Sequence, residues 1–102
     1  MRGGEAKERV TARESYQRPV APHDCNGPVV WVASIHFMLH IPNALVMEAV
    51  RAYFTTWYQD IVTDVPRVEG GYIYGLPGAG LGTRLQPDLL KRSGVQVKRS
   101  AL

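Results

Sequence analysis

Two segments of the chain carry apolar residues at a spacing that predicts helices. Residues 28–40 are apolar almost all the way round, which is typical of a helix that is covered on several sides. Residues 49–62 carry a single apolar stripe, formed by Val50, Phe54, Trp57 and Ile61. We therefore expect the first helix to pack against a sheet and further helices, and the second to bury one face.

A short extended run precedes each of these helices. Residues 19–23 are bounded by prolines, and residues 44–47 follow Pro42, so both are typical of short buried strands. Pro28 then suits the first turn of the helix between them. The order strand, helix, strand predicts two parallel strands joined by a right-handed crossover. A further helix is expected over residues 5–18, ahead of the first strand.

The chain changes character after residue 65. Glycines and prolines interrupt the apolar runs between residues 66 and 87, which is typical of turns and loops. Residues 72–74 and 95–97 are the expected strands in this part. The glycine-rich run 78–82 is comparable to a phosphate-binding loop, but it lacks a following Lys-Ser/Thr pair and a clear strand-to-helix setting. The sequence therefore does not favour nucleotide binding.

Composition narrows the class of protein. The net charge is +3, and basic residues gather near both ends of the chain. They form no run of five consecutive basic residues, and no nucleic-acid-binding motif accompanies them, so no nucleic-acid partner is expected. A single cysteine, Cys25, excludes an internal disulfide framework. We see neither a secretory signal nor an apolar stretch long enough to span a bilayer, so we expect a cytoplasmic protein without membrane contact that is soluble or aggregates.

A histidine and a glutamate, His23 and Glu48, each end an extended run that leads into a helix. The motifs around them are Ala-Pro-His-Asp-Cys at residues 21–25, Gly-Pro-Val at 27–29 and Pro-Asn-Ala-Leu-Val-Met-Glu at 42–48. Together these motifs resemble the C-terminal part of the mandelate racemase/muconate-lactonizing group of the enolase superfamily. The resemblance is closest to its galactonate dehydratase-like acid-sugar dehydratases.

The resemblance implies an α/β fold that is part of a (β/α)8 barrel. Residues 1–65 would form the last strand-helix units of the barrel, and residues 66–102 would form the C-terminal tail that in the family returns to the capping domain. A complete barrel needs about 250 residues. The 102 residues of this chain can therefore hold only part of such an enzyme.

The resemblance also implies a chemistry. In this superfamily a divalent metal, generally Mg²⁺, holds the substrate carboxylate and stabilises the enediolate that forms when a base removes the α-proton. By resemblance, His23 takes the place of the catalytic histidine at the end of the seventh strand. Glu48 takes the place of an acidic residue at the end of the eighth, where it hydrogen-bonds substrate or intermediate. The family's metal-binding carboxylates end earlier strands, so no cofactor is expected for this chain alone.

These observations lead us to interpret the chain as a truncated remnant of a Mg²⁺-dependent acid-sugar dehydratase, a carbon–oxygen lyase, that is expected to be inactive alone. One alternative is a non-catalytic interaction fragment that associates with itself or with a homologous barrel through helix 28–40. A minor alternative is a small zinc-binding module with Cys25, His36 and His40 as ligands, because histidines four residues apart on a helix often bind metal.

Overall fold

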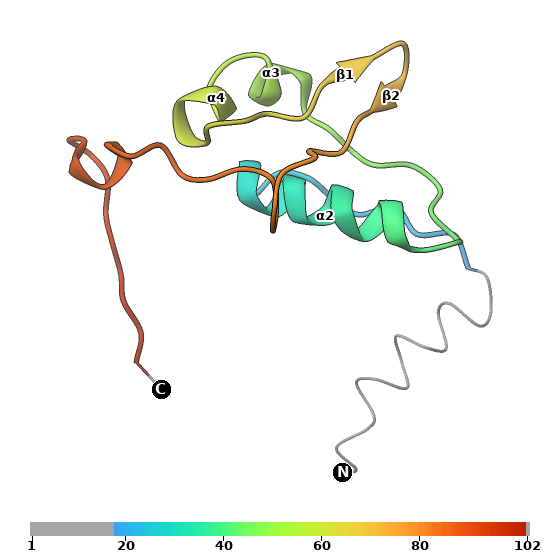
Figure 1. Ribbon diagram of the computed structural model, residues 1–102, viewed down its shortest axis with the longest axis horizontal. Coiled ribbons are helices and arrows are strands. Elements are labelled where there is room, and N and C mark those ends of the chain that lie inside the picture. The colour runs from blue at the N-terminus through green and yellow to red at the C-terminus, as the bar shows by residue number, and fades with distance from the viewer. Residues whose placement is uncertain (1–17, 102) are drawn as a thin grey trace.

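One long helix organises the structure. The computed structural model describes residues 18–101. Its elements in chain order are α2 (Pro28–His40), α3 (Arg51–Phe54), α4 (Tyr58–Ile61), β1 (Val68–Glu69), β2 (Tyr72–Ile73) and the 3₁₀ helix η1 (Leu89–Lys91). Helices α3 and α4 lie on one side of α2, and the hairpin β1–β2 follows them (Figure 1). The helix predicted over residues 5–18 falls almost wholly outside the described residues.

Helix α2 has the boundaries that the sequence predicts. Gly27 precedes it with a φ of 145°, a conformation that favours glycine, and Pro28 occupies its first turn. The helix ends at His40 because Ile41, which stands before Pro42, adopts an extended conformation. Only one side of α2 is buried, since Trp31, Val32 and Ile35 are covered and several of its other apolar side chains are exposed: Val29, Val30, Phe37 and Leu39.

The two predicted strands lie side by side, but their pairing is short. Val20 and Ala44 form an isolated parallel bridge, in which the Val20 N–H donates to Asn43 O at 3.0 Å and the Leu45 N–H donates to Val20 O at 3.0 Å. The parallel pairing of these segments across α2 is therefore confirmed. Longer strands do not form among the described residues, because each segment has only the other beside it.

The single helix expected over residues 49–62 is wrong, because two short helices, α3 and α4, stand in its place. Residues 55–57 separate them, and the side-chain hydroxyls of Thr55 and Thr56 donate to the carbonyls of Arg51 and Ala52, four residues earlier. Such bonds compete with the helical ladder and bend the chain. The break turns Trp57 outward and brings Tyr58, which lies outside the predicted stripe, into full burial.

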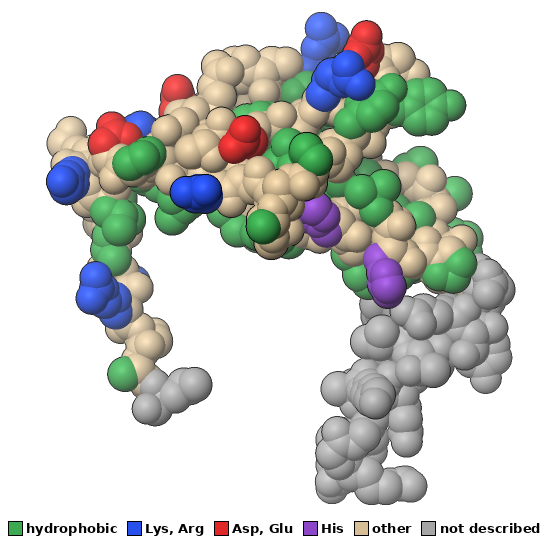
Figure 2. All heavy atoms as spheres, in the orientation of Figure 1, with side chains coloured by type: hydrophobic (Ala, Val, Ile, Leu, Met, Phe, Trp, Pro, Cys, Tyr) green, Lys and Arg blue, Asp and Glu red, His purple; other side chains and the backbone are tan. Residues whose placement is uncertain are grey.

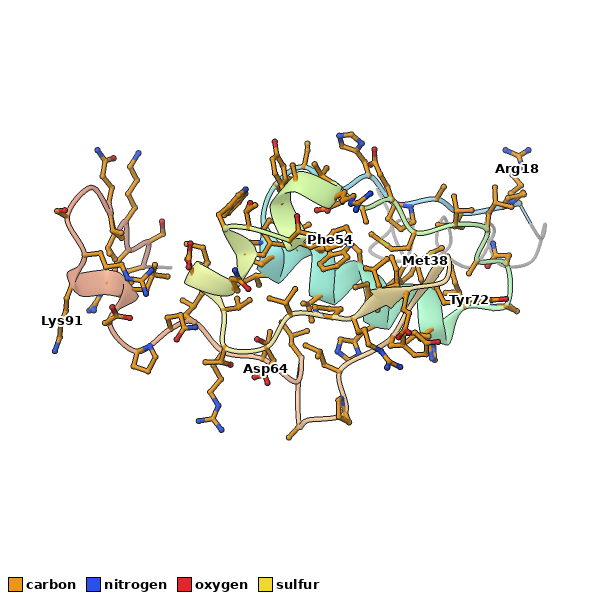
Figure 3. All side chains as sticks on the ribbon, turned by 90° about the horizontal axis from the view of Figure 1, so that it is seen from above. Arg18, Met38, Phe54, Asp64, Tyr72 and Lys91 are labelled. Atoms are coloured by element: carbon orange, nitrogen blue, oxygen red, sulfur yellow. The ribbon has the colours of Figure 1, made fainter. Side chains whose placement is uncertain are left out.

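The core lies where α2 meets α3 and α4. Trp31, Ile35 and Tyr58 are buried at its centre. The ring of Trp31 stacks on that of Phe54 at a centroid distance of 5.4 Å, and Figure 3 shows Phe54 above α2. Partly buried apolar residues complete this core: Met47, Ala49, Tyr53, Val65, Val68 and Ile73.

The part of the chain after residue 65 contains one hairpin. Strands β1 and β2 pair antiparallel through Gly70 and Gly71, whose positive φ angles suit a tight two-residue turn. The strand expected at residues 72–74 is thus confirmed at Tyr72–Ile73. The strand expected at residues 95–97 is wrong: this stretch is irregular and leads away from the rest of the chain (Figure 1). With no strand beside it, its backbone has no ladder to join.

The described residues therefore show helices and one two-stranded sheet rather than a closed barrel. Between residues 18 and 101, no helix has the length and apolarity needed to cross a membrane.

Candidate functional site

The structure brings His23 and Glu48 into direct contact. His23 Nδ1 lies 2.6 Å from Glu48 Oε2, a short charge-assisted distance. Both side chains reach solvent, with 72% of the His23 side chain and 44% of the Glu48 side chain exposed. The contact forms because the two segments that end in these residues run parallel and adjacent through the Val20–Ala44 bridge.

Two further donors hold Glu48 in place. The backbone N–H of Asp24 donates to Oε2 of Glu48 at 2.6 Å, so one carboxylate oxygen receives both this bond and the His23 contact. The indole N–H of Trp31 donates to the Glu48 carbonyl at 3.1 Å. Because Trp31 is fully buried in the core, the backbone at Glu48 is fixed relative to α2.

Asp24 is a buried carboxylate directly behind this pair. Its side chain is 1% exposed and accepts the hydroxyl of Tyr58, whose oxygen lies 3.2 Å and 3.4 Å from the two carboxylate oxygens. Burial raises the pKa of Asp24, while the bonds from Tyr58 and from the Val50 backbone lower it in part. Burial, followed by the charge of Asp24, strongly raises the pKa of Tyr58.

Sequence reasoning did not identify Asp24, Tyr58 and Trp31 as part of the site. Asp24 had one signal, its position directly after His23 at the end of an extended run. Tyr58 had none, since it lies off the apolar stripe of a continuous helix and reaches the core only because the helix is broken.

The pair can act as a hydrogen-bonded acid–base couple. An ionised Glu48 accepts the proton on Nδ1 of His23, and the neutral imidazole then keeps a lone pair on Nε2. A carboxylate that fixes the tautomer in this way makes the second nitrogen a better proton acceptor. The arrangement is suited to removing a proton from a bound molecule.

The described residues do not fit a Mg²⁺ site. Within residues 18–101, no group of three or more His, Cys, Asp or Glu side chains is placed to hold a metal ion. The two carboxylates of the site are already engaged: Asp24 accepts the Tyr58 hydroxyl, and Glu48 contacts His23 and accepts the Asp24 N–H. A hard cation such as Mg²⁺ needs free oxygen ligands, and these two carboxylates do not supply enough of them.

The zinc interpretation fails on the same geometry. Cys25, His36 and His40 are not gathered into a metal-binding group in the described part of the chain. His36 Nε2 lies instead 2.8 Å from the Leu81 carbonyl, so this histidine connects α2 to the glycine-rich loop. Cys25 is exposed, and its sulfur is 4.0 Å from Asn26 Oδ1.

Comparison with known proteins gives a consistent set of relatives. Residues 4–89 match the family described as enolase C-terminal domain-like. The chain is 27% identical over 92 residues to the D-xylonate dehydratase of Haloferax volcanii. The matched region covers 90% of this chain and 22% of that protein.

Two solved structures share both sequence and fold with the chain. An enolase of the mandelate racemase subgroup from Agrobacterium tumefaciens is 53% identical with a TM-score of 0.74, covering 87% of this chain and 24% of that one. An enolase protein from the environmental genome sequencing of the Sargasso Sea is 37% identical with a TM-score of 0.75, covering 89% of this chain and 24% of that one.

The chain spans roughly a quarter of the length of each of these relatives. The family match extends from before the first extended segment to η1 and so includes both His23 and Glu48. The chain therefore belongs to the enolase C-terminal domain-like family, in the mandelate racemase subgroup of the enolase superfamily, and is a distant homologue of an acid-sugar dehydratase.

Proposed function

We propose that this chain carries the histidine–carboxylate part of an acid-sugar dehydratase site, of the galactonate dehydratase-like type. His23 is the base that removes the α-proton of a sugar carboxylate, and Glu48 orients the imidazole and hydrogen-bonds the substrate or intermediate. The observation that carries the proposal is the 2.6 Å contact between His23 and Glu48. The kinship with a D-xylonate dehydratase supports an acid sugar as the substrate class.

The exposure of the pair supports this role. Because 72% of the His23 side chain is open to solvent, a substrate can reach the imidazole without displacing a core residue. The proton from the substrate goes to Nε2, and the resulting imidazolium is stabilised by the Glu48 carboxylate at Nδ1. The C–O bond on the adjacent carbon then breaks, and the departing hydroxyl takes the proton from the His23 imidazolium, so that water leaves and the neutral imidazole is restored.

The enolase superfamily is generally Mg²⁺-dependent, and the metal supplies electrostatic stabilisation of the negative charge on the substrate. The described residues form no site for it. The metal ligands would therefore come from other parts of an assembled barrel, and the 102 residues by themselves should be inactive. We expect no dehydration by this chain alone, with or without Mg²⁺.

A chimera tests the proposal. Residues 4–89 are grafted in register onto the remaining barrel of the Agrobacterium tumefaciens enolase and assayed with Mg²⁺ and a panel of aldonic acids for a 2-keto-3-deoxy product. His23→Asn should abolish exchange of the α-proton with solvent, whereas Glu48→Gln should reduce it less, because a positioned base acts directly on the proton. His40→Asn, at the exposed end of α2, is the matched control and should exchange normally.

Two results would contradict the proposal. Dehydration by the isolated chain would show that the remaining barrel is not needed. Undiminished proton exchange in the His23→Asn chimera would show that His23 is not the base.

An exposed apolar groove favours a second candidate function, that of a non-catalytic interaction fragment. The groove has a volume of about 420 Å³, and α2, the extended segment after Ala44 and the hairpin line it with apolar side chains that include Leu39, Leu45, Val46 and Tyr72. All four are strongly exposed. Figure 2 shows hydrophobic side chains at the surface over α2 and over the hairpin.

The occupant that we assign to this groove is the remainder of an enolase-superfamily barrel, since the solved relatives share this fold over only 24% of their own length. Native mass spectrometry of the chain mixed with the separately expressed remainder of the Agrobacterium tumefaciens barrel tests this function. A one-to-one complex is expected, and its absence would exclude the interaction.

A further inference from the structure

Asp24 connects the segment that carries His23 to the segment that carries Glu48. Its backbone N–H donates to the Glu48 carboxylate at 2.6 Å. Its own carboxylate accepts the hydroxyl of Tyr58, which lies in α4 beyond Glu48. Asp24 thus contacts the Glu48 side chain through its backbone donor and the helices that follow Glu48 through its carboxylate.

Tyr58 holds the Asp24 carboxylate in turn. Its hydroxyl reaches both carboxylate oxygens, and its ring is fully buried among aromatic neighbours. The Tyr58 and Trp57 rings meet edge to face at a centroid distance of 4.7 Å, and the Trp31 ring lies 5.7 Å from that of Tyr58. A ring packed in this way has little freedom to rotate, so its hydroxyl is a fixed anchor.

From this geometry we infer that Asp24 and Tyr58 are positioning residues that set the distance and the angle between His23 and Glu48. The chemical role of the His23–Glu48 pair rests on the proposed function, whereas the contacts that hold the pair in place do not depend on that function. Neither residue touches a substrate, since both are buried behind the exposed pair. Burying a carboxylate that has no hydrogen-bond partner lowers the stability of the fold, so the bond from Tyr58 also keeps Asp24 in its buried position.

The arrangement can be measured without any activity. Diethyl pyrocarbonate is reacted with the full chain at about pH 8, where unperturbed imidazoles are neutral, and peptide mass spectrometry gives the rates for His23 and for exposed His40. We expect His23 to react faster than His40, because Glu48 holds the Nδ1 proton and leaves Nε2 as a stronger nucleophile. Tyr58→Phe should lose this difference, so that the ratio of the two rates falls toward one.

Three further variants separate positioning from general loosening. Tyr53→Phe removes a hydroxyl from a ring 5.9 Å from Tyr58, in the same aromatic cluster, and should leave the ratio unchanged. Asp24→Ala should lower the ratio as Tyr58→Phe does. Asp24→Asn should retain most of it, since the amide oxygen can still accept the Tyr58 hydroxyl.

Each other outcome overturns the inference. A ratio of one in the unaltered chain would show that the pair is not held, and a ratio that survives both Tyr58→Phe and Asp24→Ala would show that these residues do not hold it. An equal fall in Tyr53→Phe would indicate loss of packing rather than of positioning.

In the chimera, Tyr58→Phe should lower kcat about tenfold at unchanged KM. An inactive chimera whose rate ratio still responds would refute the proposed function and leave the positioning role intact.

Discussion

The exposed groove beside α2 makes self-association of the isolated chain a direct expectation. Leu39 is the most useful position to perturb, since it lines the groove and is 65% exposed. We choose Leu39→Lys because lysine is a good helix former and a positive charge in the last turn of α2 is favourable. The substitution therefore changes the surface without opposing the helix.

The magnitude follows from the exposed fraction. Burying a whole leucine side chain gains about 1.5–3 kcal/mol. Since 65% of Leu39 remains to be covered, burial of that part gains about 1–2 kcal/mol in each copy. In a symmetric pair of chains both copies contribute, so Leu39→Lys should weaken association by about 3 kcal/mol, or on the order of a hundredfold in Kd.

Sedimentation velocity over a range of concentrations measures this effect. Leu90→Lys is the matched control, because Leu90 is 57% exposed and lies in η1 away from the groove. Figure 3 shows the neighbouring Lys91 at the opposite end of the molecule from Met38 and Tyr72, which line the groove. A monodisperse monomer with a cooperative melt in the unaltered chain, or equal weakening by both substitutions, would refute the reasoning.

Three more predictions can be tested in the Leu39→Lys background. Burial raises the pKa of Asp24 above its unfolded value of 3.8, so just above pH 3.8 the folded chain binds this proton more tightly than the unfolded chain. The free energy of unfolding should therefore fall as the pH rises above 3.8. Asp24→Asn should flatten the pH dependence of the urea midpoint in that range. If stability falls equally in both forms, the assignment is wrong. Trp31→Ala should cost about 3–5 kcal/mol and abolish the near-ultraviolet circular dichroism, and a retained signal would contradict the assigned core. Zn²⁺ should cause no stoichiometric change in circular dichroism, whereas a saturable change that Cys25→Ser removes would restore the zinc interpretation.

Local signals in the sequence were sufficient for α2 and for the parallel segments around it. Pro28 and Pro42 mark the start and the end of the helix, and both act through backbone sterics that do not depend on the rest of the fold. The meeting of His23 with Glu48 follows from the same pattern, because the ends of two adjacent parallel segments lie together. The roles assigned to these two residues come from the family resemblance and stay predictions.

The features that could not be predicted depend on competition between local and tertiary interactions. Thr55 and Thr56 are compatible with a helix by spacing alone, and their side-chain bonds to the preceding turn decide otherwise. The position of Tyr58 in the core follows from that break. Val95 and Val97 have strand-like alternation, but a strand requires a neighbour, and alternation within one segment cannot supply it.

The double role of Trp31 has an optical consequence. Its ring lies at the centre of the core, and its indole N–H is bonded to the backbone carbonyl of Glu48. The emission of this indole therefore depends on a hydrogen bond made by the candidate site as well as on burial. With Trp57→Phe removing the second tryptophan of the chain, the fluorescence of Trp31 becomes a built-in reporter. Any ligand or partner that displaces the backbone at Glu48 would then register as a spectral change, without an added label.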